Sequence, residues 1–94
     1  MSYALDITEF ATDDLVTLLD SLPLTRRSEA FEAVWRELNG LAENPLEVPR
    51  VVSDRPTHLF SFIAEGVHYF WGATFRFSED EKLVVITHVF RLAL

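Results

Sequence analysis

Apolar positions in the first half of the chain recur with the period of an α-helix. Residues 9–22 and 26–43 each place large apolar side chains three or four positions apart, which predicts two amphipathic helices. Pro23 ends the first stripe and Asn44-Pro45 ends the second. Because so few residues separate the stripes, we expect an antiparallel helical hairpin. The stripe residues expected in the core are Leu15, Leu18, Leu22, Phe31, Val34 and Leu38.

The pattern changes to that of β-strands in the second half. Residues 58–64, 67–77 and 83–91 are rich in aromatic and β-branched residues, and polar turns separate them, so they predict an antiparallel meander. Tyr3, Leu5 and Ile7 alternate with other residues and predict a short N-terminal strand. Residues 47–52 fit either an edge strand or a loop, because they contain a proline. In the long strand, the alternate positions Tyr69, Trp71 and Phe75 are expected to face the helices.

These elements predict one α+β domain spanning residues 1–94. Its N-terminal strand and two-helix hairpin should pack on one face of a twisted antiparallel β-sheet. A chain of 94 residues with 49% hydrophobic composition and no cysteine must rely on its apolar core for stability. A cytoplasmic location without membrane attachment is expected, because the longest uncharged stretch, residues 67–75, is too short to span a bilayer.

The net charge of −7 disfavours long-range attraction to nucleic acid, so binding to RNA would need a local basic patch. Such a patch is conceivable because Arg50, Arg55, Arg76 and Arg91 fall among the apolar segments of the second half. The sequence contains no metal-ligand spacing and no glycine-rich phosphate loop. We therefore expect neither a metal ion nor another cofactor.

The order of several short motifs resembles the RelE/ParE superfamily of toxins from bacterial type II toxin–antitoxin systems. These motifs are Leu41-Ala42-Glu43-Asn44-Pro45 at the end of the hairpin, then Phe75-Arg76-Phe77, Asp80-Glu81-Lys82 and Val84-Val85-Ile86-Thr87-His88-Val89-Phe90-Arg91. The resemblance implies helices on one face of a twisted antiparallel sheet. It also implies that functional side chains lie on the opposite, concave face.

For function, the resemblance implies a ribosome-associated mRNA endoribonuclease with Arg76, His88 and Arg91 as candidate catalytic residues. In the ribonuclease members of the family, such residues promote attack of an RNA 2′-hydroxyl on the adjacent phosphate. From the residues alone, an equally weighted interpretation remains. In it, Arg76 and Arg91 pair with surplus acidic groups, and His88 packs at the edge of the sheet.

Two other hypotheses follow from the small number of basic residues, among which Lys82 is the single lysine. One is a non-catalytic toxin that binds DNA gyrase, and the other is an inactive member that retains only partner binding. In every case the resemblance implies a cognate antitoxin protein. A homodimer is the alternative partner, since Val84, Ile86, Phe90 and residues 92–94 supply more apolar surface than the inward side of the last strand is expected to bury.

Overall fold

The elements expected from the sequence are present in the computed structural model, which describes residues 3–45 and 56–92. They are β1 (Ala4–Ile7), α1 (Glu9–Asp20), the short 3-10 helix η1 (Leu24–Arg26), α2 (Arg27–Glu43), β2 (Thr57–Ala64), β3 (Val67–Ser78) and β4 (Leu83–Arg91). Both predicted helices and the predicted strands are confirmed to within a few residues. The candidate edge strand at residues 47–52 lies outside the described residues.

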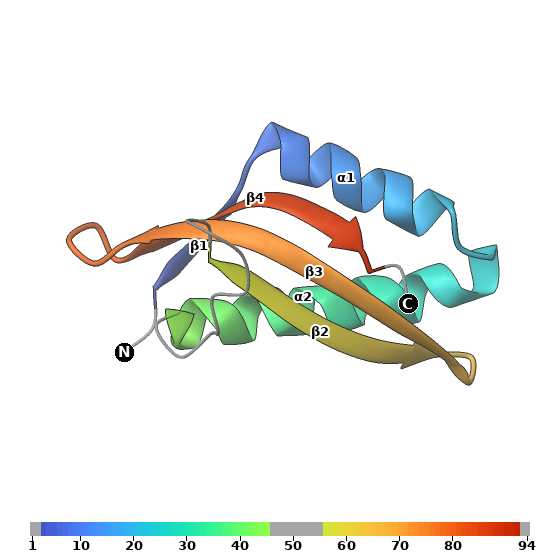
Figure 1. Cartoon of the computed structure of the whole chain (residues 1–94). Coiled ribbons are helices and arrows are strands. Elements are labelled where there is room, and N and C mark those ends of the chain that lie inside the picture. The colour runs from blue at the N-terminus through green and yellow to red at the C-terminus, as the bar shows by residue number, and fades with distance from the viewer. Residues whose placement is uncertain (1–2, 46–55, 93–94) are drawn as a thin grey trace.

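The described strands form one mixed sheet in the order β1-β4-β3-β2 (Figure 1). The β2–β3 and β3–β4 pairs are antiparallel, which confirms the meander. The β1–β4 pair is parallel. The expectation of a wholly antiparallel sheet is therefore wrong for this pair. The helices and the meander separate β1 from β4 in the chain, so no tight hairpin requires these two strands to run in opposite directions.

Local chemistry explains where the elements begin and turn. The side chain of Thr8 accepts a hydrogen bond from the backbone N–H of Ala11 and caps the first turn of α1. Glu65 and Gly66 form the two-residue loop between β2 and β3, with φ values of 50° and 76°. Two successive positive φ values are those of the turn whose twist matches a β-hairpin, and glycine adopts the second without steric cost.

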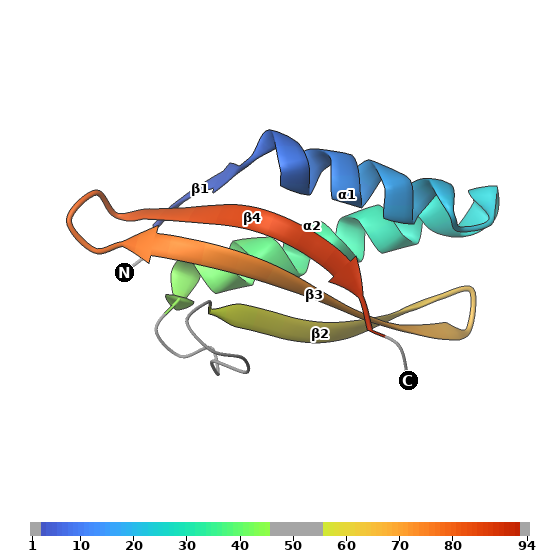
Figure 2. The same cartoon turned by 45° about the horizontal axis from the view of Figure 1, so that its top comes forward.

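Both helices pack on one face of the sheet and share a single core with it (Figures 1 and 2). Helix α1 runs beside β4, whereas α2 packs against β2. None of the described helices is long and apolar enough to cross a bilayer. The core residues with the lowest exposure include Ala11, Ala30, Val34, Leu38, Ala64, Trp71, Ala73, Phe75, Val84 and Ile86.

The expected core is confirmed for Leu15, Leu22, Val34, Leu38, Trp71 and Phe75 but is wrong for Phe31. The Phe31 side chain is 46% exposed and packs edge-on against Trp35 at the rim, with their ring centroids 6.0 Å apart. The buried stripe of α2 instead passes through Ala30 and Ala33, whose small side chains let the helix approach the sheet closely. Leu18 and Tyr69 are only partly buried.

The expectation of surplus apolar surface on the last strand is wrong for two of its residues. Val84 and Ile86 are completely buried beneath the helices. Phe90 and Leu92 have intermediate exposure, and residues 93–94 lie outside the described part of the chain. The parallel register with β1 explains the burial, because it places Leu5 and Ile7 beside Val84 and Ile86 on the inward side.

Replacing Leu38 with Ala should lower the free energy of unfolding by about 2–5 kcal/mol, because it leaves a cavity in a fully buried site. The same truncation at Phe31 should cost less, since nearly half of that side chain already contacts solvent. Denaturant melts of the two variants test the packing of α2. A larger loss for Phe31→Ala than for Leu38→Ala would contradict it.

Candidate functional site

The face of the sheet turned away from the helices, termed the open face, carries alternate residues of the long strand β3. On this strand they are His68, Phe70, Gly72, Thr74 and Arg76, because Trp71, Ala73 and Phe75 point inward. The strand register places residues of the neighbouring strands beside them. These neighbours are Leu59, Ser61 and Ile63 on β2 and Val85, His88 and Phe90 on β4.

A β-bulge in β4 decides which of its residues reach the open face. Phe75 pairs with Ile86 and Thr74 pairs with His88, so Thr87 is an extra residue in the strand. The Thr87 hydroxyl donates to the carbonyl oxygen of Thr74 at 3.1 Å, and the two hydroxyl oxygens lie 2.8 Å apart. These contacts hold the bulge in place between β3 and β4.

The bulge brings two of the three candidate catalytic residues to one face. His88 pairs with Thr74, and Arg76 lies two residues farther along β3 on the same side. The Cα atoms of such diagonal neighbours are typically about 7–8 Å apart. Arg91 instead pairs with Trp71, whose side chain is buried beneath the helices. Arg91 is therefore on the helix-facing side of the sheet, away from Arg76 and His88.

His88 is held against α1, which sequence reasoning did not link to the site. Its Nδ1 lies 3.4 Å from Oδ2 of Asp14, and the same oxygen accepts the backbone N–H of Val89 at 3.1 Å. The Phe10 ring lies one helical turn earlier on α1, with its centroid 6.3 Å from that of the imidazole. The Asp14–His88 contact spans 74 positions of sequence, so no local motif could have revealed it.

Arg76 lines a pocket of about 290 Å³ beside the β3–β4 turn. Leu83 and Val85 give this pocket apolar walls, and Ser78 and Glu81 add polar groups. The Arg76 side chain is exposed, and among the described residues it has no ion pair. Its guanidinium is therefore available to a phosphate, for which its fork of donors is well suited.

The other described cations have local partners or lie elsewhere. Arg26 donates to the Tyr69 hydroxyl at 3.1 Å and lies 3.5 Å from Glu65. The hydrogen bond to Tyr69 is the main reason that the pKa of Arg26 is raised above its ordinary value. Arg27 binds the Leu22 carbonyl oxygen, and Lys82 lies over the Tyr3 ring. Arg76 is thus the one arginine that the described strands present on the open face.

Most described carboxylates lie away from the same face, and the exceptions are Asp14 beside His88 and Glu81 in the Arg76 pocket. Within the four described strands, Asp6 is the only acidic residue. The other described carboxylates belong to α1, α2, the turn at Glu65 and the turn at residues 79–81. The excess negative charge therefore lies mainly on the helix layer and the turns.

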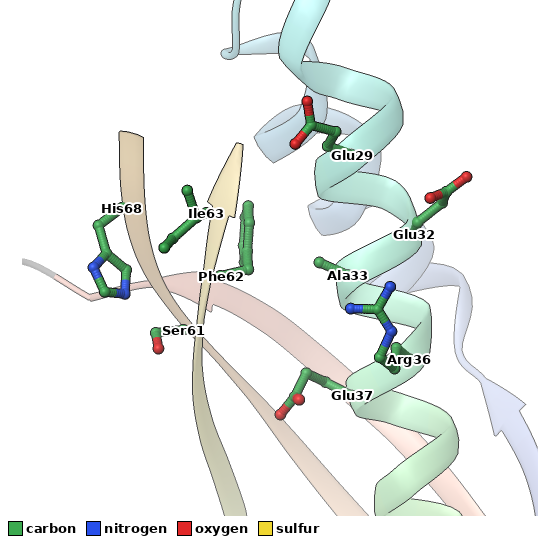
Figure 3. Close-up of a pocket in the computed structure, with 9 residues that line it drawn as sticks. All are labelled: Glu29, Glu32, Ala33, Arg36, Glu37, Ser61, Phe62, Ile63 and His68. Atoms are coloured by element: carbon green, nitrogen blue, oxygen red, sulfur yellow. The ribbon is translucent and has the colours of Figure 1, made fainter. Parts of the chain in front are cut away.

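A second pocket, of about 410 Å³, lies along the outer edge of β2 (Figure 3). Figure 3 shows Phe62 on the side of β2 toward α2, and Ser61 and Ile63 on the opposite side. Glu37 points toward the strand and binds His58, with Oε1 3.1 Å from Nε2. With Glu29 and Glu32 also in its wall against a single Arg36, this pocket is acidic and differs from the one at Arg76.

The centre of the open face is apolar. A Cβ added to Gly72 would lie only 2.6 Å from the Phe90 ring and 2.9 Å from Leu59, so these side chains meet above the glycine. Leu59, Ile63 and Phe70 remain 41%, 59% and 36% exposed. The open face thus combines an apolar surface over β2 and β3 with Arg76 and His88 near β4. No cluster of three potential metal ligands exists among the described residues.

Comparison with solved structures identifies the fold as that of RelE toxins. The RelBE toxin–antitoxin complex of Mycobacterium tuberculosis has a chain with a TM-score of 0.60 and 20% identity, covering 98% of this chain and 100% of its own. A free RelE of Escherichia coli in which two arginines are replaced by alanine has a TM-score of 0.60 and 17% identity, covering 97% of this chain and 84% of its own. A chain of the intact E. coli RelBE complex has a TM-score of 0.54 and 15% identity, covering 99% of this chain and 100% of its own.

At the level of sequence, no protein-family model and no curated protein matches this chain. The predicted RelE-like architecture is confirmed by the structural matches, each of which extends over nearly the whole chain.

Proposed function

We propose that this protein is the toxin of a type II toxin–antitoxin module and cleaves mRNA at the ribosome. The observation that carries the proposal is the position of Arg76 and His88 on one open face of a RelE-like sheet. An exposed guanidinium and an exposed imidazole on neighbouring strands supply a cation and an acid/base group to one ligand.

The geometry fits transfer of a phosphoryl group within RNA. The 2′-hydroxyl oxygen attacks the adjacent phosphorus and loses its proton, while the bond from phosphorus to the 5′-oxygen breaks and that oxygen gains a proton. His88 is suited to accept or donate one of these protons. Arg76 is suited to stabilise the negative charge that accumulates on the phosphate oxygens in the transition state. The products are a 2′,3′-cyclic phosphate and a 5′-hydroxyl.

The acidic composition is compatible with this role because the charge is segregated. The carboxylates of α1 and α2 lie on the helix layer, and salt screens their field beyond about 8 Å at physiological ionic strength. The open face contributes few phosphate contacts, so the ribosome would supply much of the affinity for mRNA.

Alanine substitution distinguishes the two residues of the open face from Arg91. In a cleavage assay with translating ribosomes, Arg76→Ala and His88→Ala should each lower kcat by about 100-fold or more, since each removes a group that acts in the transition state. Arg91→Ala is the matched control and should stay within about threefold of the unsubstituted protein, because that residue lies on the other side of the sheet. Equal losses in all three variants would contradict the assignment.

The open face also favours a second candidate function, a toxin that binds DNA gyrase without cleaving RNA. Its motivation is that Arg76 is the only described arginine on this face, beside exposed Leu59, Ile63 and Phe70. A gyrase supercoiling assay run beside the ribosome assay separates the two functions. Inhibition of gyrase without RNA cleavage would replace the first proposal.

For the antitoxin, we propose that it binds the apolar part of the open face. Leu59, Ile63 and Phe70 are neighbours on two paired strands, because Phe70 pairs with Ser61, which lies between the other two on the open face, whereas the exposed apolar residues of the helices are divided among α1, η1 and α2. This surface continues around the edge of β2 into the acidic pocket, so the partner should bring basic residues to Glu29 and Glu37. A protein bound there would also restrict access of RNA to the open face.

Ile63→Ser should weaken binding of the protein encoded by the adjacent reading frame by about tenfold, because the 59% exposed side chain is part of the proposed contact. Val16→Ser removes a similarly exposed apolar side chain from α1 and is the control, with no expected loss. Both variants should keep their unfolding free energy within about 0.5 kcal/mol. Analytical ultracentrifugation of the lone protein and of Ile63→Ser shows in addition whether a homodimer uses this surface, because a dimer that dissociates in the variant would favour a second copy as the occupant.

A further inference from the structure

The contact between α1 and β4 assigns a role to Asp14 that depends on the proposed acid/base function of His88. We propose that Asp14 is a positioning residue, whose carboxylate holds the His88 ring with the proton on Nδ1 and leaves Nε2 to exchange protons with RNA. The residue touches no expected reacting atom and acts only through His88.

The first argument is the geometry of the carboxylate oxygen. Oδ2 of Asp14 is 3.4 Å from Nδ1 of His88 and accepts the backbone N–H of Val89 at 3.1 Å. The residue that follows His88 in the chain therefore fixes the oxygen that contacts its ring. A carboxylate can only accept, so at neutral imidazole charge this contact requires the proton to be on Nδ1.

The second argument is that the surroundings limit the positions of both groups. Asp14 projects from the middle of α1, and this helix is anchored to β4 by the Thr8 N–H, which donates to the Ile86 carbonyl oxygen at 3.0 Å. Phe10 lies one turn away on the same helix, with its ring 6.3 Å from that of His88. The imidazole is thus placed between an aromatic ring and an anchored carboxylate.

The third argument is energetic. The side chains of His88 and Asp14 are 47% and 38% exposed, and ion pairs exposed to this degree contribute little to stability. Orientation of a ring and selection of its tautomer do not require a strong pair. They require an acceptor at a fixed place, which is how a third group orients the base in many nucleophile–base pairs.

The experiment reads the tautomer of His88 directly by long-range ¹H–¹⁵N NMR of the full-length protein at alkaline pH. The unsubstituted protein should show the Nδ1–H form of His88, and Asp14→Ala should shift the ring to the Nε2–H form. Asp13→Ala is the matched control, since it removes the neighbouring carboxylate of α1, which forms no hydrogen bond with the ring among the described residues, and it should leave the tautomer unchanged. An Nε2–H ring in the unsubstituted protein, or a tautomer insensitive to Asp14→Ala, would overturn the proposal.

Activity gives an independent readout. In the ribosome assay, Asp14→Ala should lower kcat by about tenfold with KM unchanged, and it should cause no further loss in the His88→Ala background. If Asp14→Ala failed to fold, the tautomer in the unsubstituted protein would still decide the question. If no protein cleaved RNA but the tautomer shifted as expected, the proposed function would fail and the positioning role would stand. If RNA were cleaved but the tautomer did not respond to Asp14→Ala, the proposed function would stand and the positioning role would fail.

Discussion

The arrangement of the site depends on how the outer edge of β4 is completed after β1 ends at Ile7. Beyond that residue no described strand pairs with this edge, and its backbone groups need other partners. Thr8 and Asp14 supply them, binding Ile86, Thr87 and Val89 through one hydroxyl, one backbone N–H and one carboxylate. Helix α1 must therefore lie along the edge, and His88 becomes its neighbour.

The same requirement explains why a short strand is sufficient at this position. A longer β1 would form the backbone hydrogen bonds of this edge by itself, and α1 would then not be held beside His88. The capping threonine contributes to both the helix and the edge of the sheet. Thr8 caps α1 through its side chain, and its backbone N–H and hydroxyl also bind two carbonyl oxygens of β4.

The sequence predicted the features that depend on local pattern. The helices, the meander and most of the core follow from spacing, because an amphipathic element buries whichever face is apolar. Phe31 was misplaced because it shares the apolar spacing of Val34 and Leu38 but lies at the margin of that stripe, where Ala30 and Ala33 are the buried residues. The parallel β1–β4 pair and the Asp14–His88 contact join distant segments, and no local spacing encodes them.

The candidate site shows a similar division between local and non-local information. Simple alternation along β3 predicts that Arg76 points to the other face from Trp71 and Phe75, and in the structure Arg76 lies on the open face. In β4 alternation fails, because the bulge at Thr87 reverses the sides of all later residues. Both His88 and Arg91 were candidates from sequence, and only knowledge of the register separates them.

The bulge has a consequence for how relatives of this chain are aligned. If the ladder were regular and Thr87 paired with Thr74, His88 would pair with Ala73 and Arg91 would pair with Phe70. Loss of the bulge would thereby exchange an imidazole for a guanidinium on the open face, although no residue had mutated. A relative with a one-residue gap at Thr87 would therefore keep His88 opposite Thr74, whereas a gapless relative with a regular ladder would not. Two chains with identical letters at the compared columns can present different groups to the same ligand.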